Sequence, residues 1–288
     1  MHTDVEGGSA LLQSQTAAAR ASELARVRVV DVHEMGMLEE VNDLLTSIWG
    51  TTTQGAPIPL DVLRSISHAG CSVTAAYNTD GEICGAAVAI VSAETASAYS
   101  LIAGVRAGRA DSGVGYALKQ HQRSWALAHG LERMVWTFDP LVSRNARFNL
   151  SKLGATVDEY NPNFYGTMLD DINADDESDR LVATWTLAGD RTVACSEGAA
   201  HDPALPDFRS HQVRSFGPDE RPAVIESAGV LWCRVPRDIV SLRTQRPAEA
   251  REWRRSVREA LTDAFDAGYT ATSVTRSGWY RLAKGVHS

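Results

Sequence analysis

Apolar positions follow two different spacings in the first part of the chain. Residues 27–32 are rich in valine, and this β-branched run predicts a first strand. Residues 37–48 then repeat apolar side chains at helical spacing, and a second short helix is expected at residues 60–66. The pattern therefore predicts one strand followed by two helices.

An Asp80-Gly81 pair separates two further apolar runs, at residues 73–77 and 83–91. Asp-Gly readily adopts the positive φ angles of tight hairpin turns, so these runs predict two antiparallel strands. Residues 99–105 predict the next strand.

Strands and helices alternate after this point. Gly113 and Gly115 open an amphipathic helix that Gly130 ends, and residues 134–138 are again strand-like. The following segments are expected to be a helix at residues 145–153, a stop at Gly154 and a strand at residues 155–160. Hairpins followed by alternating strands and helices predict an α/β fold, with a mixed sheet and a parallel pair of strands near its middle.

Composition divides the chain into four parts. We expect a mobile tail or a frayed helix at residues 1–25, a main domain at 26–188, a linker or long loop at 189–207 and a C-terminal α/β segment at 208–288 that packs on the main sheet. The C-terminal segment is expected to contain strands at residues 230–235, 269–274 and 279–282 and a helix from Pro247 to Gly268.

The net charge and the length of the apolar runs indicate which kinds of partner the protein can bind. The 288 residues carry a formal net charge of -8 and no long Lys/Arg cluster, which argues against binding to nucleic acid or anionic lipid. The longest apolar run, at residues 86–91, is strand-sized, and the N-terminus lacks the apolar core of a signal peptide. We therefore expect a cytoplasmic protein that acts on a small molecule.

The spacing of cysteines and histidines does not predict a metal site. The four cysteines lack CxxC pairing, and the eight histidines form no H-x-x-x-H pattern. The acidic residues between positions 175 and 179 are expected to form a solvated loop. No metal cofactor is expected.

Residues 109–115, Arg-Ala-Asp-Ser-Gly-Val-Gly, connect a predicted strand to a predicted helix. Unpaired N–H groups at a helix start attract anions, and glycines without a β-carbon let a pyrophosphate approach closely. Gly-x-Gly is also common in turns that bind nothing, and the Walker lysine and the third glycine of a dinucleotide fold are both missing. The loop alone therefore leaves a phosphate site and a plain turn open.

The surroundings of this loop are more specific. Gly113-Val114-Gly115, the strand at residues 134–138 and the helix at 145–153 before Gly154 resemble motifs A and B of the GNAT acyltransferase superfamily. The strings at residues 136–141, 144–150 and 165–166 look similar to a bacterial branch of predicted acetyltransferases and amino-acid N-succinyltransferases.

The resemblance implies an acyl-CoA bound where two parallel strands splay apart, with its pantetheine paired to residues 101–105 like an added strand. Its pyrophosphate would bind the main-chain amides that follow Arg109. Asn145 resembles the asparagine that contacts the pantetheine arm, but it is also suited to cap its helix. The implied cofactor-binding residues are Ile102, Ala103, Val105, Ala110, Asp111, Ser112, Gly113, Val114, Gly115 and Asn145.

Two positions depart from the family pattern. Ala110 stands where an arginine or glutamine usually opens the phosphate loop, and Arg109 lies one place away. Leu150 replaces the tyrosine that many members use to protonate the leaving thiolate. Phosphate affinity and the identity of the acid are therefore open.

Amide formation requires a base that takes a proton from the attacking amine and a donor for the leaving sulfur. We assign Tyr165 as the candidate acid and Asp139 and Glu94 as candidate bases, although each is also typical of a packing, capping or solvated residue. Arg144 and Arg147 are candidates for holding a substrate carboxylate, with ligand-free surface arginines as the alternative.

Ser100 marks the acceptor side of the same strand, and main-chain N–H groups of residues 101–105 are expected to polarise the thioester carbonyl. The sequence thus favours an acyl-CoA-dependent N-acyltransferase that moves an acetyl or succinyl group to a small amine, such as an amino acid or a biosynthetic intermediate. Two alternatives keep the fold: O-acylation or decarboxylation, and a non-catalytic acyl-CoA sensor. The C-terminal segment either completes the active site or mediates a homodimer.

Overall fold

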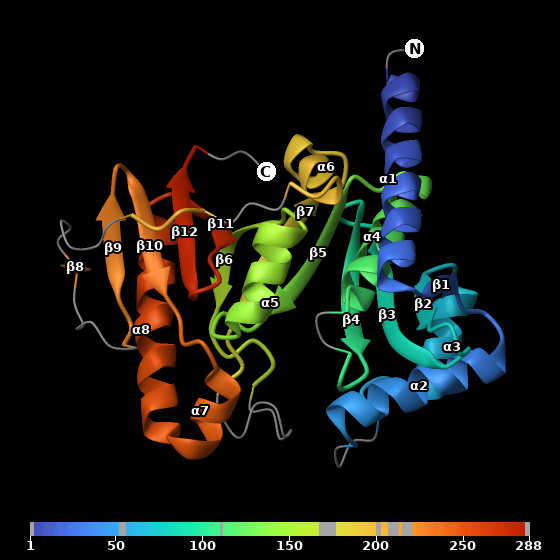
Figure 1. Ribbon diagram of the computed structural model, residues 1–288, viewed down its shortest axis with the longest axis horizontal. Coiled ribbons are helices and arrows are strands. Elements are labelled where there is room, and N and C mark those ends of the chain that lie inside the picture. The colour runs from blue at the N-terminus through green and yellow to red at the C-terminus, as the bar shows by residue number, and fades with distance from the viewer. Residues whose placement is uncertain are drawn as a thin grey trace. The chain divides into compact units, whose positions relative to one another are not determined.

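The computed structural model of the chain describes residues 3–51, 56–109, 112–166, 177–199, 203–206, 213–214 and 221–285 (Figure 1). The chain forms two compact units. Unit 1 comprises Met1–Val135 and Thr186–Glu197, and unit 2 comprises Trp136–Trp185 and Gly198–Ser288. The boundary falls inside strand β5 (Arg133–Phe138), which contributes residues to both units.

Unit 1 is a sheet with helices on both faces. Its strands are β1 (Arg28–Asp31), β2 (Ser72–Tyr77), β3 (Ile83–Ser92), β4 (Ser97–Val105) and the first part of β5, and its helices are α1 (Thr3–Ala25), α2 (Met35–Trp49), α3 (Leu60–His68), α4 (Val114–Ala128) and α6 (Asp190–Ser196). Strands β1 to β4 pair antiparallel in chain order, and β5 pairs parallel to β4. The predicted mixed α/β fold with an internal parallel pair is confirmed.

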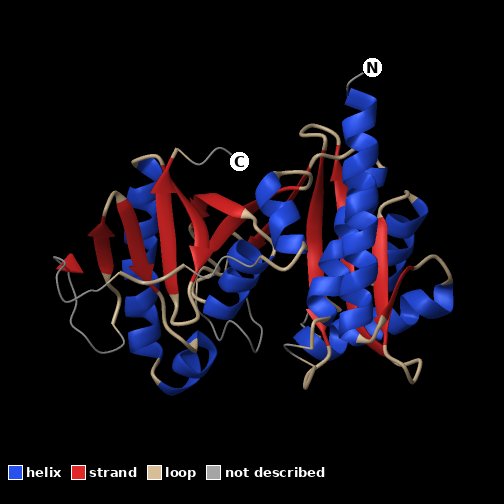
Figure 2. Cartoon of the chain, turned by 45° about the horizontal axis from the view of Figure 1, so that its top comes forward, coloured by secondary structure: helices blue, strands red, loops and turns tan. Residues whose placement is uncertain are grey.

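Alternation along the strands divides the core of unit 1 between the two faces of the sheet. Ala86 of β3 packs in a cluster with apolar residues of α2 and α3. The next residue, Ala87, packs instead with Val114 and Leu118 of α4. Successive strand residues point to opposite faces, so α4 covers one face and α2 with α3 covers the other (Figure 2).

Two glycine-based predictions hold in unit 1. Gly81 has a φ of 81° in the turn between the antiparallel strands β2 and β3, as the Asp80-Gly81 pair predicts. Helix α4 starts at Val114, and Gly130, with a φ of 72°, follows its end.

The segment that we expected to be a mobile tail or a frayed helix contains helix α1, which is packed rather than frayed over its second half. Ser14, Ala17, Ala18, Ala21 and Ala25 are all buried, and Ala21 and Ala25 form a cluster with Ala117 of α4. Alanine has the highest helix propensity, and its small side chain lets two helices approach closely. A buried helix face made of alanine and serine is little more hydrophobic than the exposed face, so the apolar spacing alone did not reveal this packing.

Part of the predicted linker is also ordered. Residues 190–196 form α6, and Cys195 and Ser196 are buried in unit 1. The Ser196 hydroxyl accepts a hydrogen bond from Gln13 Nε2 at 2.9 Å, and the Cys195 carbonyl accepts one from the Tyr116 hydroxyl at 3.1 Å. These contacts join α6 to both α1 and α4.

Unit 2 is built around a second set of strands. Its strand order is β7 (Arg180–Thr186), β6 (Thr156–Asn161), β11 (Tyr269–Val274), β12 (Trp279–Lys284), β10 (Val230–Arg234), β9 (Val224–Ser227) and β8 (Val213–Arg214). Its helices are α5 (Ser143–Arg147), a π-helical turn (Phe148–Lys152), α7 (Ile239–Gln245) and α8 (Pro247–Asp266). Ala271 of β11 pairs with Val157 of β6, so the C-terminal segment shares a sheet with residues 156–161.

Helix α8 supplies much of the core of unit 2. It starts with Pro247 at its first turn and buries Trp253, Val257, Leu261 and Ala264 on one stripe, as the apolar spacing predicts. Among the described residues, no helix has both the length and the apolar content that crossing a membrane requires.

Candidate functional site

Strand β4 has a paired part and an open part. It pairs with β5 from Ser97, opposite Arg133, to Tyr99, opposite Val135. Within the described residues, no strand pairs with the rest of this edge. A β-bulge follows immediately, because Ser100 pairs with Ala89 of β3, Ile102 pairs with Val88, and Leu101 between them is an extra residue that is 41% exposed.

The peptide groups beyond the bulge have a defined direction. Arg106 N donates to Cys84 O at 2.9 Å, so Arg106 faces β3. Alternate residues of an antiparallel strand face the same neighbour, so Gly104 also faces β3, whereas Ala103 and Val105 turn their N–H and C=O groups to the open edge. This edge can therefore pair with an extended ligand, as predicted for residues 101–105.

A tight loop leads from this edge to α4. Ser112 N and Ser112 Oγ both donate to Arg109 O, at 3.2 and 2.6 Å. Gly113 has a φ of 87° and is the N-cap residue of α4, which starts at Val114. The first N–H groups of a helix have no intrahelical acceptor, so the amides of Val114 and Gly115 are available to an anion. The predicted phosphate-binding residues Ala110 and Asp111 lie outside the described residues.

The glycines near this site serve different purposes. A β-carbon on Gly85 would lie 2.7 Å from Val114 Cγ1, and one on Gly104 would lie 2.6 Å from the Trp49 ring, so packing excludes side chains at both positions. A β-carbon on Gly115 would meet its nearest neighbour, Val105 Cγ2, at 3.5 Å, which is an ordinary contact. Internal packing therefore does not require glycine at position 115, whereas close approach by a ligand does.

A buried polar cluster lies against β4 at the bulge. Lys119 Nζ of α4 donates to Ser100 Oγ at 2.6 Å, and Ser100 Oγ donates to Gln122 Oε1 at 3.2 Å. All three residues are buried, and burial lowers the pKa of Lys119 to about 7. Ser100 was predicted to lie near the acceptor, but Lys119 and Gln122 were not. The sequence signal that could have identified Lys119 and Gln122 was their position beside the apolar residues of an amphipathic helix.

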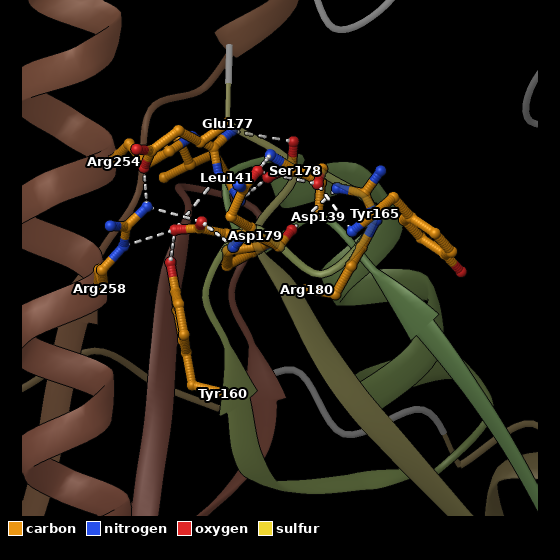
Figure 3. Close-up of polar contacts among 12 residues, drawn as sticks. Asp139, Leu141, Tyr160, Tyr165, Glu177, Ser178, Asp179, Arg180, Arg254 and Arg258 are labelled. Carbon is orange, nitrogen blue, oxygen red and sulfur yellow. Dashed lines mark hydrogen bonds and ion pairs between the residues drawn. The ribbon is translucent and has the colours of Figure 1, made fainter. Parts of the chain in front are cut away.

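Unit 2 contains a second polar cluster, centred on two buried aspartates (Figure 3). Asp139 Oδ2 accepts from Arg243 and from Arg254, the latter at 3.3 Å, and Asp139 Oδ1 accepts from Leu141 N at 2.9 Å. Burial alone would raise the pKa of Asp139, but Arg254 and Arg243 lower it below its usual value. A carboxylate stabilised in this way is a weak base, so the geometry favours a structural role for Asp139 over the predicted catalytic one.

Asp179 is the second aspartate, and it corrects one sequence prediction. We expected residues 175–179 to be solvated, but Asp179 is fully buried. It accepts from the Tyr160 hydroxyl at 2.6 Å, from Asn163 N at 2.9 Å and from Arg258 at 2.7 and 2.9 Å. Burial and the neighbouring Asp179 carboxylate raise the pKa of Tyr160. The cluster therefore fixes the turn after β6 against α8.

Tyr165 projects from this turn. Its amide donates to Ser178 Oγ at 2.9 Å, and the Arg180 guanidinium lies 5.2 Å from its ring centre (Figure 3). Its hydroxyl lies 3.0 Å from Thr137 Oγ1. The side chain is 50% exposed. Its backbone is thus fixed by Ser178, and its side chain is half exposed with the hydroxyl hydrogen-bonded to Thr137.

The other predicted site residues lie apart from these two clusters. Glu94 is exposed in the turn between β3 and β4. Asn145 and Arg144 are exposed on α5, and Arg147 is half-buried. The N-cap residue of α5 is Val142, so Asn145 does not cap its helix.

No protein-family model matches the sequence, and no curated protein matches it. Solved structures with a similar backbone include the ribosomal-protein-S18-alanine N-acetyltransferase from Escherichia coli, with 14% identity and a TM-score of 0.46 over 56% of this chain and 94% of that chain. An N-acetyltransferase from Staphylococcus aureus Mu50 has 15% identity and a TM-score of 0.47 over 56% of this chain and 98% of its own.

A GNAT superfamily phosphinothricin acetyltransferase from Sinorhizobium meliloti, solved in complex with AcCoA, has 15% identity and a TM-score of 0.46 over 55% of this chain and 87% of its own. With TM-scores below 0.5, these similarities leave the chemistry of this chain to be argued from its own residues.

Proposed function

We propose that unit 1 binds an acyl-CoA and that the protein transfers its acyl group to an amine. The observation that carries the proposal is the continuity of two features: an open β4 edge, and a glycine-containing helix start that follows it in the chain. The edge suits the amide groups of a pantetheine arm, and the helix start suits a pyrophosphate. The motif resemblance of residues 101–166 supports the same ligand.

The residues present fit such a ligand. Ala103 and Val105 would pair with the pantetheine, and the amides of Val114 and Gly115 would hold the pyrophosphate. The space next to Gly115 supports this assignment, because no contact inside the protein accounts for a glycine there. When bound, the acyl-CoA supplies the thioester, and this chain's main-chain N–H groups polarise the carbonyl.

The finer assignments belong to the same proposal. We favour a small amine, such as an amino acid, and an acetyl or succinyl donor. Tyr165 is the proposed acid for the leaving sulfur, because its side chain is half exposed and its backbone is fixed. Arg144 and Arg147 are proposed contacts for an acceptor carboxylate.

The test is release of free thiol from acetyl-CoA or succinyl-CoA in the presence of glycine, glutamate, lysine, glycinamide or putrescine. We expect release with at least one amine, formation of the corresponding amide by mass spectrometry, and a higher melting temperature with acyl-CoA. An absence of acyl-CoA binding would contradict the proposal.

One observation favours a second candidate, a non-catalytic acyl-CoA sensor. Leu150, which stands in place of the usual tyrosine, is fully buried in the π-helical turn and offers no proton donor. Tight acyl-CoA binding without thiol release across the amine panel would support this alternative.

A further inference from the structure

The acyl transfer proposed above requires a base, and neither predicted base suits the role. Asp139 is held by two arginines in a buried ion cluster. Glu94 lies in an exposed turn at the start of β4. The search for a base therefore turns to the polar cluster formed by Ser100, Lys119 and Gln122.

We propose that Lys119, acting through the hydroxyl of Ser100, takes up the proton that the attacking amine loses. This inference rests on the proposed function, since it assigns a step in that reaction. Ser100 would touch the amine, and Lys119 would act behind it as the final proton acceptor.

The position of Ser100 supports this role. It is the first residue of β4 beyond the pairing with β5, and it directly precedes the bulge at Leu101. The bulge shifts the alternation of side chains along β4, and the Ser100 hydroxyl lies 2.6 Å from Lys119 Nζ of α4. A hydroxyl and an amine at this distance can exchange a proton directly.

The surroundings of Lys119 favour its neutral form. Its side chain is only 5% exposed, and burial lowers its pKa to about 7, so the neutral amine is populated near neutral pH. The α1 side chains buried against α4 are alanines and Ser14. The titratable groups on the neighbouring strands are Arg28 and Asp31 of β1, Tyr77 of β2, Cys84 of β3 and Tyr99 of β4. Those of α4 itself are Tyr116, Arg123 and His121, which is bonded to Asp31.

The proton transfer balances. As the amine nitrogen forms its bond to the acyl carbon, its N–H proton passes to Ser100 Oγ while the Ser100 hydroxyl proton passes to Lys119 Nζ. The C–S bond breaks, and the thiolate leaves with the electron pair and takes a proton from water. Lys119 ends as an ammonium ion that returns its proton to solvent. Gln122 Oε1 can hold the Ser100 hydroxyl between turnovers.

The experiment measures kcat/KM as a function of pH, with acetyl-CoA as donor and the fastest of the five amines as acceptor. It compares the wild type with Lys119→Met and Ser100→Ala, and Lys152→Met serves as the control. Lys152 lies in the π-helical turn of unit 2, whereas Ser100 and Lys119 belong to unit 1. For the wild type we expect kcat/KM to rise with pH along an ascending limb whose apparent pKa is near 7. The Lys119→Met and Ser100→Ala variants should lose this limb and roughly 10²-fold in rate, with unchanged acetyl-CoA affinity, while Lys152→Met should resemble the wild type.

Several outcomes would overturn the inference. Wild-type rates and an unchanged limb in Lys119→Met or Ser100→Ala would remove both residues from the reaction while leaving acyl transfer intact. A uniform loss of rate at every pH, with the limb retained, would show a structural role. If Lys119→Met does not fold, Ser100→Ala decides the question. A wild type that binds no acyl-CoA and releases no thiol would instead refute the proposed function itself.

Discussion

The buried lysine makes a testable prediction about stability. Lys119 has a pKa of about 7 in the folded protein against 10.5 in the unfolded chain. Between these two values the unfolded chain binds a proton that the folded protein does not, so stability should rise with pH across this window. Replacing Lys119 with methionine, which has a similar length and no charge, should abolish this dependence.

The size of the effect follows from the two pKa values. Burying Lys119 should cost about 4 kcal/mol at pH 7 and about 1 kcal/mol at pH 9.5. The Lys119→Met variant should therefore be more stable than the wild type at pH 7, and its advantage should shrink by roughly 3 kcal/mol on going to pH 9.5. The other titrating groups are the same in the wild type and in Lys119→Met, so their contributions cancel in the difference between the two free energies of unfolding.

The assay is urea unfolding of both proteins at pH 7 and pH 9.5, followed by circular dichroism and tryptophan fluorescence. Lys152→Met serves as the control, with no change in its stability difference between the two pH values. A stability difference between wild type and Lys119→Met that is the same at both pH values would refute the reasoning. That result would mean that Lys119 keeps its charge in the folded protein.

Two further substitutions test the packing and the ion cluster. Asp139→Ala should cost about 3–5 kcal/mol in urea unfolding, because the buried guanidinium groups of Arg243 and Arg254 both lose this carboxylate, with Arg254 still 3.7 Å from Asp179; a loss below about 1 kcal/mol would contradict this. Gly104→Ala should cost about 1–3 kcal/mol, because its β-carbon would lie 2.6 Å from the Trp49 ring; an unchanged melting temperature would show that the ring moves aside freely.

Local signals in the sequence predicted much of unit 1. The Asp80-Gly81 hairpin, the helix start after Gly113 and the parallel pairing of β4 with β5 all depend on short-range turn chemistry or on apolar spacing. The packing of α1 was missed because a face of alanines resembles a low-complexity tail. The bulge at Leu101 was also missed, since one extra residue leaves no mark on the apolar pattern.

Long-range polar contacts could not be predicted. Asp139 meets Arg243 and Arg254 across separations of 104 and 115 residues, and no spacing rule connects such positions. Lys119 lies beside Leu118 on α4, and only the packing of that helix on β4 shows that its amine is buried. Tyr165 was selected from a motif, and its half-exposed side chain became visible only in the folded turn.

Calorimetric titration of acetyl-CoA into the wild type and Gly115→Ala tests the central claim most directly. Gly115 is the second residue of α4, and Gly36, the second residue of α2 with nothing within 4 Å of an added β-carbon, offers the matched control Gly36→Ala. Both substitutions should leave the fold intact and stabilise their helices slightly. The account predicts that the wild type and Gly36→Ala bind acetyl-CoA equally and that Gly115→Ala binds at least about tenfold more weakly. Equal binding by all three proteins, or no binding by the wild type, would contradict it.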